Sequence, residues 1–142
     1  MNKVKAIDEI KKILDVSKVG VLSTAYDNLP HSRYMIFYNK EEVLYTKTSK
    51  DSFKVEEIES NPHVYILLGY EETKNRSYVE ITGKAEIVED QETIDWLWNI
   101  QDKSFFESKE DPRLTVLKIT PTEIKLLNDD NLDTPETVNF TD

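Results

Sequence analysis

The sequence predicts a mainly β domain: a six-stranded antiparallel barrel, closed or nearly closed, with helices flanking it. Six segments are rich in β-branched and apolar residues, as strands are, and only three segments show helical periodicity. So few crossover helices argue against a parallel, doubly wound sheet. An antiparallel barrel fits this order because its strands can join through short turns and closure removes exposed sheet edges.

Each predicted strand is bounded by turn-forming or polar residues. The first two are separated by Tyr26-Asp27-Asn28-Leu29-Pro30 and should form a hairpin. Residues 63–70 are almost continuously apolar, which predicts a strand covered on both faces. Residues 77–88 alternate between apolar and polar, which predicts one buried face. In chain order the strands are 19–24, 32–38, 43–47, 63–70, 77–88 and 114–127.

The predicted helices have apolar side chains spaced three and four residues apart. The second should end at Asn61-Pro62, because the residue before a proline disfavours helical geometry. Residues 128–142 are acidic and polar and are expected to form a loose tail, so the barrel domain is predicted to span residues 1–127. The three helices are 3–17, 51–60 and 90–98.

Composition excludes several kinds of site. The chain of 142 residues suits one domain and has no cysteine and only two histidines. Disulfides, zinc–thiolate sites, iron–sulfur clusters and a cysteine nucleophile are therefore excluded, and we expect no metal site. The net charge of −10 disfavours nucleic acid and anionic membranes as partners. With no long apolar run and no signal-peptide pattern, we expect a cytoplasmic protein.

One segment combines a strand end, a helix start and several anion-binding side chains. A helix N-terminus presents unpaired N–H groups and the positive end of the helix dipole, which suit a phosphate. Arg33, on a neighbouring predicted strand, can add a bidentate guanidinium. A plain helix cap with solvated lysines explains the same residues, so both interpretations stay open. The hydroxyl and lysine side chains of the segment are Lys47, Thr48, Ser49, Lys50, Ser52 and Lys54.

The order of several short motifs resembles the pyridoxamine-phosphate-oxidase-like family of FMN-binding split barrels. That family shows an arginine-led strand, a strand ending in an aromatic residue and threonine, a Ser-x-Lys helix start and an Asn-Pro helix end. Later motifs are similar to its general stress protein branch, and the resemblance extends to residue 127. The matching positions are Arg33, Tyr45-Thr46, Ser52-x-Lys54, Asn61-Pro62, Gly83-Lys84-Ala85-Glu86, Trp98-Asn99 and Asp111-Pro112.

The resemblance implies a split β-barrel that binds FMN. It implies that Arg33 and Lys54 contact the flavin phosphate, with hydroxyl groups from Ser52 and from Thr48 or Ser49. The backbone of the arginine-led strand would run along the flavin ring. In this family the flavin lies between two subunits, so a homodimer is implied. The implied cofactor-binding residues are Arg33, Tyr34, Met35, Ile36, Tyr45, Thr46, Thr48, Ser49, Ser52 and Lys54.

Departures from the family pattern argue against true pyridoxamine-phosphate oxidase activity. The segment between Thr46 and Ser52 is longer than in the oxidases, and Tyr38 stands where they have a lysine. Residues 123–127 (Glu-Ile-Lys-Leu-Leu) do not match the Arg-x-His with which the oxidases grip the vitamer. These differences remove the residues that hold the vitamer but leave the implied FMN site in place.

Four functional hypotheses remain open. The first is an FMN-dependent oxidoreductase with a small-molecule electron donor or acceptor, in which no side chain is identified as an acid or base. The second is a flavin carrier or sensor without turnover. The third is a dimeric interaction module that has lost its flavin. The fourth is a split barrel that binds a deazaflavin or haem in place of FMN. The sequence alone therefore leaves open whether the protein is an enzyme.

Three further features have a structural interpretation. Trp96 and Trp98 are expected in the core or at a dimer interface, with stacking on a flavin or substrate as the alternative. Glu57 is expected on a solvated helix face together with its glutamate neighbours. His31, at the start of a strand, is expected to be exposed.

Overall fold

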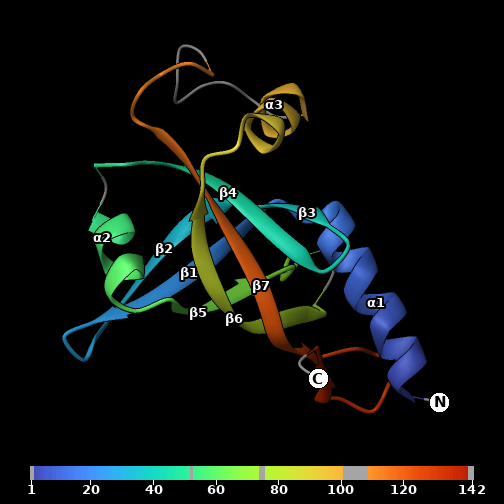
Figure 1. Cartoon of the computed structure of the whole chain (residues 1–142). Helices are drawn as coiled ribbons and strands as arrows, with labels where there is room; N and C mark the ends of the chain where they lie inside the picture. Colours follow the sequence, from blue (N-terminus) through green and yellow to red (C-terminus); the bar gives the residue numbers. More distant parts are fainter. Residues whose placement is uncertain (1, 52, 74–75, 101–108, 141–142) are drawn as a thin grey trace.

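The computed structural model describes residues 2–51, 53–73, 76–100 and 109–140. Within these ranges an antiparallel sheet of eight strands is flanked by three helices (Figure 1). The strands are β1 (Val19–Tyr26), β2 (Leu29–Ile36), β3 (Tyr38–Lys40), β4 (Val43–Ser49), β5 (His63–Leu68), β6 (Tyr78–Val88), β7 (Leu114–Leu127) and β8 (Glu136–Asn139). The helices are α1 (Asn2–Val16), α2 (Phe53–Ser60) and α3 (Gln91–Ile100).

The strand order explains why the sheet curls. Neighbours pair antiparallel in the order β2-β1-β5-β6-β7-β4-β3, and β8 pairs with β7. The two strands at the ends of this order, β2 and β3, are joined by the single residue Phe37. Such a connection spans only about 7 Å, so the two ends of the sheet must come together. The sheet therefore closes on itself as a split β-barrel.

Phe37 fixes the point of closure from inside the barrel. Its side chain is 1% exposed, and its N–H donates to the backbone oxygen of Lys18 over 2.6 Å. Gly20 on β1 leaves room for it, because a Cβ there would lie 3.1 Å from the Phe37 ring and 2.6 Å from Leu67 O. A larger residue at position 20 would therefore push apart the strands that Phe37 joins.

The helices cover different parts of the barrel (Figure 1). The apolar side of α1 is buried and contacts β3, β6, β7 and β8. α2 lies on the other side of the barrel, against β1 and β6. α3 packs through Ile94 and Leu97 on a second hydrophobic cluster that includes Leu114 and Val116 of β7. The core is therefore divided between the inside of the barrel and the layer beneath α3.

The structure confirms the fold class and corrects the number of strands. The hairpin between β1 and β2 turns at Asp27 and Asn28, whose φ angles of 51° and 64° are typical of a two-residue turn. The predicted strand 32–38 divides at Phe37, because the chain leaves β1 there and joins the other end of the sheet. With β8, this raises the count from six to eight in the described residues.

Two further expectations were wrong. The predicted strand 63–70 is not covered on both faces, since Tyr65 and Leu67 of β5 are 38% and 39% exposed. The segment 128–142 is not a loose tail throughout, because β8 pairs with β7 and Val138 is buried in the core. Leu132 and Phe140 also pack against that core. Apolar side chains on either side of β8 thus anchor a segment whose average composition is polar.

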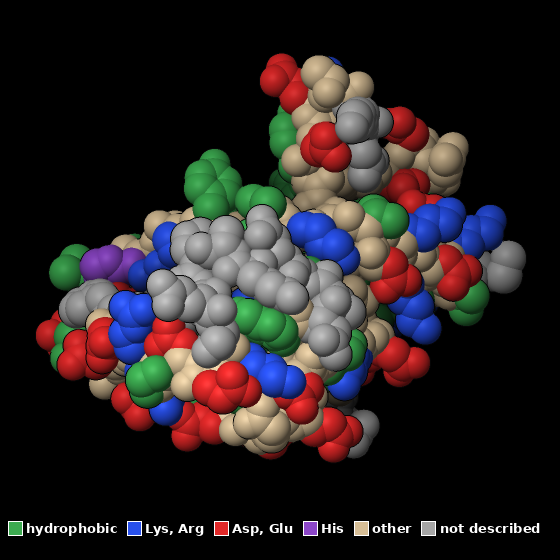
Figure 2. All heavy atoms as spheres, turned by 90° about the horizontal axis from the view of Figure 1, so that it is seen from above, with side chains coloured by type: hydrophobic (Ala, Val, Ile, Leu, Met, Phe, Trp, Pro, Cys, Tyr) green, Lys and Arg blue, Asp and Glu red, His purple; other side chains and the backbone are tan. Residues whose placement is uncertain are grey.

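The surface is mixed in charge. Figure 2 shows acidic and basic side chains interspersed across one side of the molecule. Among the described residues, none of the helices has both the length and the hydropathy that a membrane span requires.

Candidate functional site

The predicted cofactor-binding residues lie mainly on two strands that meet where the barrel closes. We call the line along which β2 and β4 meet the seam. Ser52 lies outside the described residues, and Lys54 belongs to α2 but its side chain is not described. The predicted residues on β2 are Arg33, Tyr34, Met35 and Ile36. Those on β4 are Tyr45, Thr46, Thr48 and Ser49.

A side-chain hydrogen bond crosses the seam. Thr46 is 1% exposed, and its hydroxyl donates to the backbone oxygen of Ile36 over 2.7 Å. β2 and β4 are not neighbours in the sheet, so this bond replaces a strand ladder at their point of contact. The threonine of the aromatic–threonine motif therefore has a structural role: it ties β4 to the last residue of β2.

Side chains alternate between the two faces of β2. Arg33 stands opposite Leu22, and Met35 stands opposite Gly20; both partners occupy buried positions on β1. Tyr34 points the other way and is 79% exposed. Arg33 therefore enters the barrel from its edge strand, whereas Tyr34 faces outwards.

Arg33 belongs to a cluster of four polar side chains, here called the ionic cluster: Thr24, His31, Arg33 and Glu57. Arg33 Nη2 donates to Glu57 Oε2 over 3.1 Å, and Arg33 Nη1 donates to Thr24 Oγ1 over 2.9 Å. The Thr24 hydroxyl in turn donates to Glu57 Oε2. His31 Nε2 lies 3.5 Å from Glu57 Oε1. The cluster links β1, β2 and α2 around one carboxylate.

Glu57 contradicts the sequence prediction. It was expected on a solvated face of the helix, but it is 0% exposed. Its neighbours Glu56 and Glu59 are exposed, whereas Val55 and Ile58 are buried. The periodicity of Val55 and Ile58 does not signal this burial, because residue 57 lies about 160° around the helix from Val55 and about 100° from Ile58. It also does not identify the arginine that pairs with Glu57. His31 is partly exposed, with 39% of its side chain accessible.

The outer face of β4 carries a different group, here called the aromatic cluster: Tyr45, Trp96 and Trp98 with Lys40 and Lys47. Tyr45 and Trp96 meet edge to face with centroids 5.2 Å apart. Lys40 Nζ lies 4.3 Å from the Trp96 ring centroid, and Lys47 Nζ lies 4.5 Å from that of Trp98. The two tryptophans pack against the hydrophobic cluster beneath α3, in line with the core interpretation.

The two hydroxyl residues at the end of β4 have different environments. Thr48 is 5% exposed, and Ser49 is partly exposed. Ser49 Oγ accepts a hydrogen bond from the Asp51 N–H over 3.2 Å, which orders the chain just before α2. Ser49 therefore shapes the entry to the helix through its own side chain.

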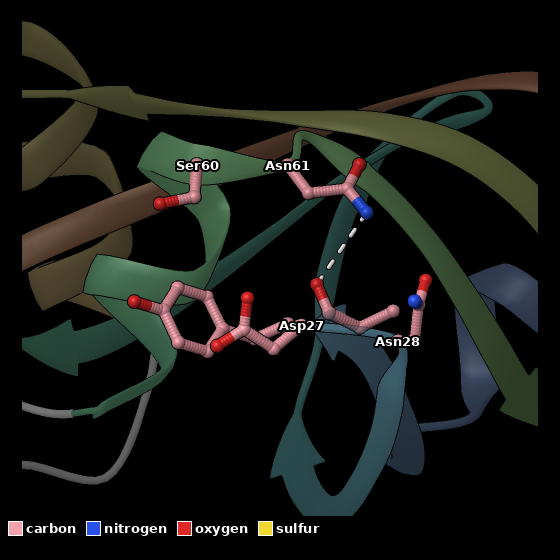
Figure 3. A pocket seen from close by; sticks show the side chains of 6 residues that line it. Asp27, Asn28, Ser60 and Asn61 are labelled. Carbon is pink, nitrogen blue, oxygen red and sulfur yellow. Dashed lines mark hydrogen bonds between the residues drawn. The ribbon is translucent and has the colours of Figure 1, made fainter.

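A polar hollow of about 470 Å³ lies beside the β1–β2 turn (Figure 3). Asn61 reaches into it from the end of α2, and its Nδ2 donates to Ala25 O over 3.4 Å. Asn61 Oδ1 also accepts from the His63 N–H over 3.1 Å. The Asn-Pro motif thus fastens the end of α2 to β1 and β5. Among the predicted cofactor-binding residues that the structure describes, none lines this hollow.

Comparison with known proteins places the chain in a family. A family model described as "Pyridoxamine 5'-phosphate oxidase like" matches residues 5–129. General stress protein 26 of Bacillus subtilis (strain 168) is 43% identical over 129 residues, which cover 90% of this chain and 92% of that protein. The chain belongs to the pyridoxamine 5'-phosphate oxidase-like family. The family match includes every residue predicted to bind a cofactor.

Solved structures of family members share the architecture. The crystal structure of General Stress Protein 26 from Bacillus anthracis str. Sterne has a TM-score of 0.83 at 34% identity, over 95% of this chain and 98% of that one. A putative pyridoxamine 5'-phosphate oxidase from Listeria innocua has a TM-score of 0.79 at 36% identity, over 87% of this chain and 99% of that one. The split barrel of this pyridoxamine 5'-phosphate oxidase-like chain is therefore the architecture of its relatives.

Proposed function

We propose that this protein binds FMN at the seam and acts as a flavin-dependent oxidoreductase. The observation that carries the proposal is Arg33, a guanidinium placed on an edge strand with a quarter of its side chain accessible. Its bonds to Glu57 and Thr24 engage two of the five N–H donors of a guanidinium. The remaining donors suit a phosphate, which guanidinium groups bind in bidentate fashion.

Other features of the seam fit a flavin. β2 pairs with β1 on one side only, so its other edge offers backbone N–H and C=O groups for the polar edge of a flavin ring. The family resemblance adds Ser52 and Lys54 at the start of α2. Among solved structures that share the fold, one from Mesorhizobium loti is named a FAD-binding protein and another is named an F420 reductase. These names support a flavin-type ligand here.

The protein's own residues would bind and orient the cofactor. When bound, FMN supplies the redox chemistry by accepting and releasing electrons. Arg33 and Lys54 would hold its phosphate, and the backbone of residues 34–36 would orient its ring. Residues 123–127, which replace the vitamer-gripping motif of the oxidases, lie in β7 and pair with β6 and β8. The proposed substrate is therefore a small molecule other than the pyridoxamine-phosphate vitamer.

We further propose that the protein is a homodimer with the flavin at the interface. The outer face of β2, β1 and β5 carries accessible apolar side chains in adjacent registers: Tyr34 and Leu67 both stand opposite Val21. Val19 on the same face is 60% exposed. A second copy would cover this face. In analytical ultracentrifugation, Leu67→Asp should shift the protein towards monomer, whereas Val16→Asp on α1 should not. A wild type of monomer mass would contradict the dimer, and a Leu67→Asp variant of dimer mass would contradict this interface.

The experiment that tests FMN binding is a titration of purified protein with FMN, followed by visible absorbance. We expect saturable binding with a perturbed flavin spectrum, and weaker binding by Lys54→Ala. Lys5→Ala, a change on the exposed side of α1, is the matched control and should bind like the wild type. No binding by the wild type at micromolar flavin would overturn the proposal and favour a flavin-free interaction module.

Turnover separates the enzyme from a flavin carrier. The holoprotein should oxidise NADH or NADPH in the steady state when a small electron acceptor is present. Normal FMN binding without such turnover would overturn the oxidoreductase part of the proposal alone.

A further inference from the structure

We propose that Glu57 is a positioning residue for the phosphate site, acting through Arg33. This inference rests on the proposed FMN function. It concerns a carboxylate that does not belong to the family motifs and that the sequence predicted to be solvated. The geometry points to this role because the buried carboxylate accepts a hydrogen bond from the Arg33 guanidinium and leaves other N–H groups of that guanidinium for a ligand.

The first argument is the cost of burying Glu57. An ionised carboxylate in the protein interior is stable only when it is paired and hydrogen-bonded. Glu57 is 0% exposed, and its Oε2 accepts hydrogen bonds from both Arg33 and Thr24. Its Oε1 accepts no hydrogen bond within the described residues and lies 3.5 Å from His31 Nε2. A buried hydrophobic residue at this position would pack without such partners. The ionic cluster therefore stabilises the fold no better than an apolar residue would, but it does hold the Arg33 guanidinium in place.

The second argument is geometric. Arg33 would otherwise be a long, rotamer-rich side chain on an edge strand. Glu57 and Thr24 engage one N–H on each terminal nitrogen, Nη2 and Nη1. Because the guanidinium is planar, two such bonds fix its orientation as well as its position. The remaining N–H groups of Arg33 then point in fixed directions. Phosphate binding therefore costs less entropy, because the Arg33 side chain is already ordered.

The third argument is the helix that carries Glu57. Residue 54 precedes Glu57 by three positions in α2, a spacing that puts both positions on one side of the helix. The Arg33–Glu57 ion pair joins β2 to α2 across 24 positions of sequence. It therefore sets the distance between the two elements that supply Arg33 and Lys54.

The test compares FMN with riboflavin, which has the same ring system but no phosphate. We expect Glu57→Ala to weaken FMN binding by at least about tenfold, the scale of one charge-assisted hydrogen bond. Riboflavin binding should change by less than about twofold, because Arg33 has no phosphate to contact. A variant that is merely misfolded would lose both ligands equally, so the contrast separates positioning from structural damage.

Matched variants sharpen the test. Glu57→Gln keeps the shape and an acceptor oxygen, so it should restore most of the FMN affinity; it also covers the case in which Glu57→Ala does not fold. Glu56→Ala and Glu59→Ala change exposed carboxylates of the same helix and should bind FMN like the wild type. In an Arg33→Met background, Glu57→Ala should have no further effect on FMN binding, because Glu57 acts on the phosphate only through Arg33.

The outcomes are distinguishable. If the wild type binds FMN and Glu57→Ala binds it equally well, the positioning role is wrong while the proposed function stands. If Glu57→Gln binds FMN more tightly than the wild type, Glu57 competes with the phosphate for Arg33, which also overturns the inference. If the wild type binds neither FMN nor riboflavin, the proposed function fails and this inference fails with it.

Discussion

On the β2 side of the seam, Arg33 and Thr24 converge on the buried carboxylate of Glu57, whereas on the β4 side Tyr45 packs edge to face against Trp96. Both groups fasten a strand near the seam to a helix. The ionic cluster does so with charges that must be desolvated, and the aromatic cluster does so with apolar rings whose burial is favourable in itself.

The difference indicates which side is built for a ligand. The aromatic packing beneath α3 needs no ligand to account for it, because burying large aromatic rings stabilises the fold by itself. A buried ion pair is seldom more stable than an apolar replacement, so it needs a further reason. The cluster around Arg33 therefore has the stronger claim to a functional role than the aromatic cluster.

The largest effect on the free energy of unfolding is expected from removing the carboxylate of Glu57. Glu57→Ala leaves a partly buried Arg33 without its counterion, and the free energy of unfolding should fall by about 3 kcal/mol. Glu56→Ala, an exposed change one residue away, should alter it by less than about 0.5 kcal/mol. Urea denaturation of both variants measures the difference. Equal midpoints would mean that the ionic cluster does not form in solution.

A smaller effect is expected from the aromatic cluster. Trp96 is half-buried, so Trp96→Ala should cost about 2 kcal/mol, less than a fully buried aromatic residue. Trp96→Phe keeps a ring against Tyr45 and should recover part of the loss. If this cluster is packing only, the FMN affinity of the folded variant stays unchanged. A large loss of FMN binding by Trp96→Phe at normal stability would instead favour the stacking role.

The same two regions show what the sequence could predict. The barrel, the hairpin at Asp27-Asn28 and the packing of the tryptophans against the cluster beneath α3 follow from local patterns of hydrophobicity and turn residues. Glu57 does not, because its neutralising arginine lies on another element and helical periodicity treats a glutamate as a surface residue. The family motifs identified Arg33 and Thr46 but not the partners that hold them.

The features of the fold that the sequence did not predict also have physical causes. Residues 32–38 are uniformly strand-forming, so nothing local marks the change of partner at Phe37. Tyr65 and Leu67 were expected to be covered because apolar runs usually are, yet no described helix lies over their face of β5. Val138 was missed because it stands alone in a polar segment, where the pairing of β8 with β7 decides its burial.

A third prediction separates the charge of the aromatic cluster from its packing. Lys40 is exposed, and its ammonium lies over the Trp96 ring. Lys40→Met keeps a similar length but removes the cation, and should cost about 0.5 kcal/mol, as exposed cation–π pairs do. In a Trp96→Ala background the same change should cost nothing, which a double-mutant cycle measures. Lys5→Met, on α1, is the exposed control.

The smallest effect at neutral pH is expected at Tyr65, on the outer face of the sheet, where its hydroxyl donates to the Glu80 carboxylate. Partial burial, and then the hydrogen bond and negative charge of Glu80, raise the pKa of Tyr65 from 10.0 to about 12. Below pH 10 the folded and unfolded chains both keep this proton, so Tyr65 causes no pH dependence there. Between pH 10 and 12 the unfolded chain releases it first, so the contribution of Tyr65 to stability falls as the pH rises.

Glu80→Gln tests this directly, because removing the carboxylate charge should lower the pKa of Tyr65 towards its ordinary value. Tyrosinate absorbance, read as the difference between each protein and its Tyr65→Phe derivative, isolates the one hydroxyl. The Tyr65 signal should appear at lower pH in the Glu80→Gln background than in the wild type. Identical titration curves would show that the outer face holds no specific Tyr65–Glu80 pair.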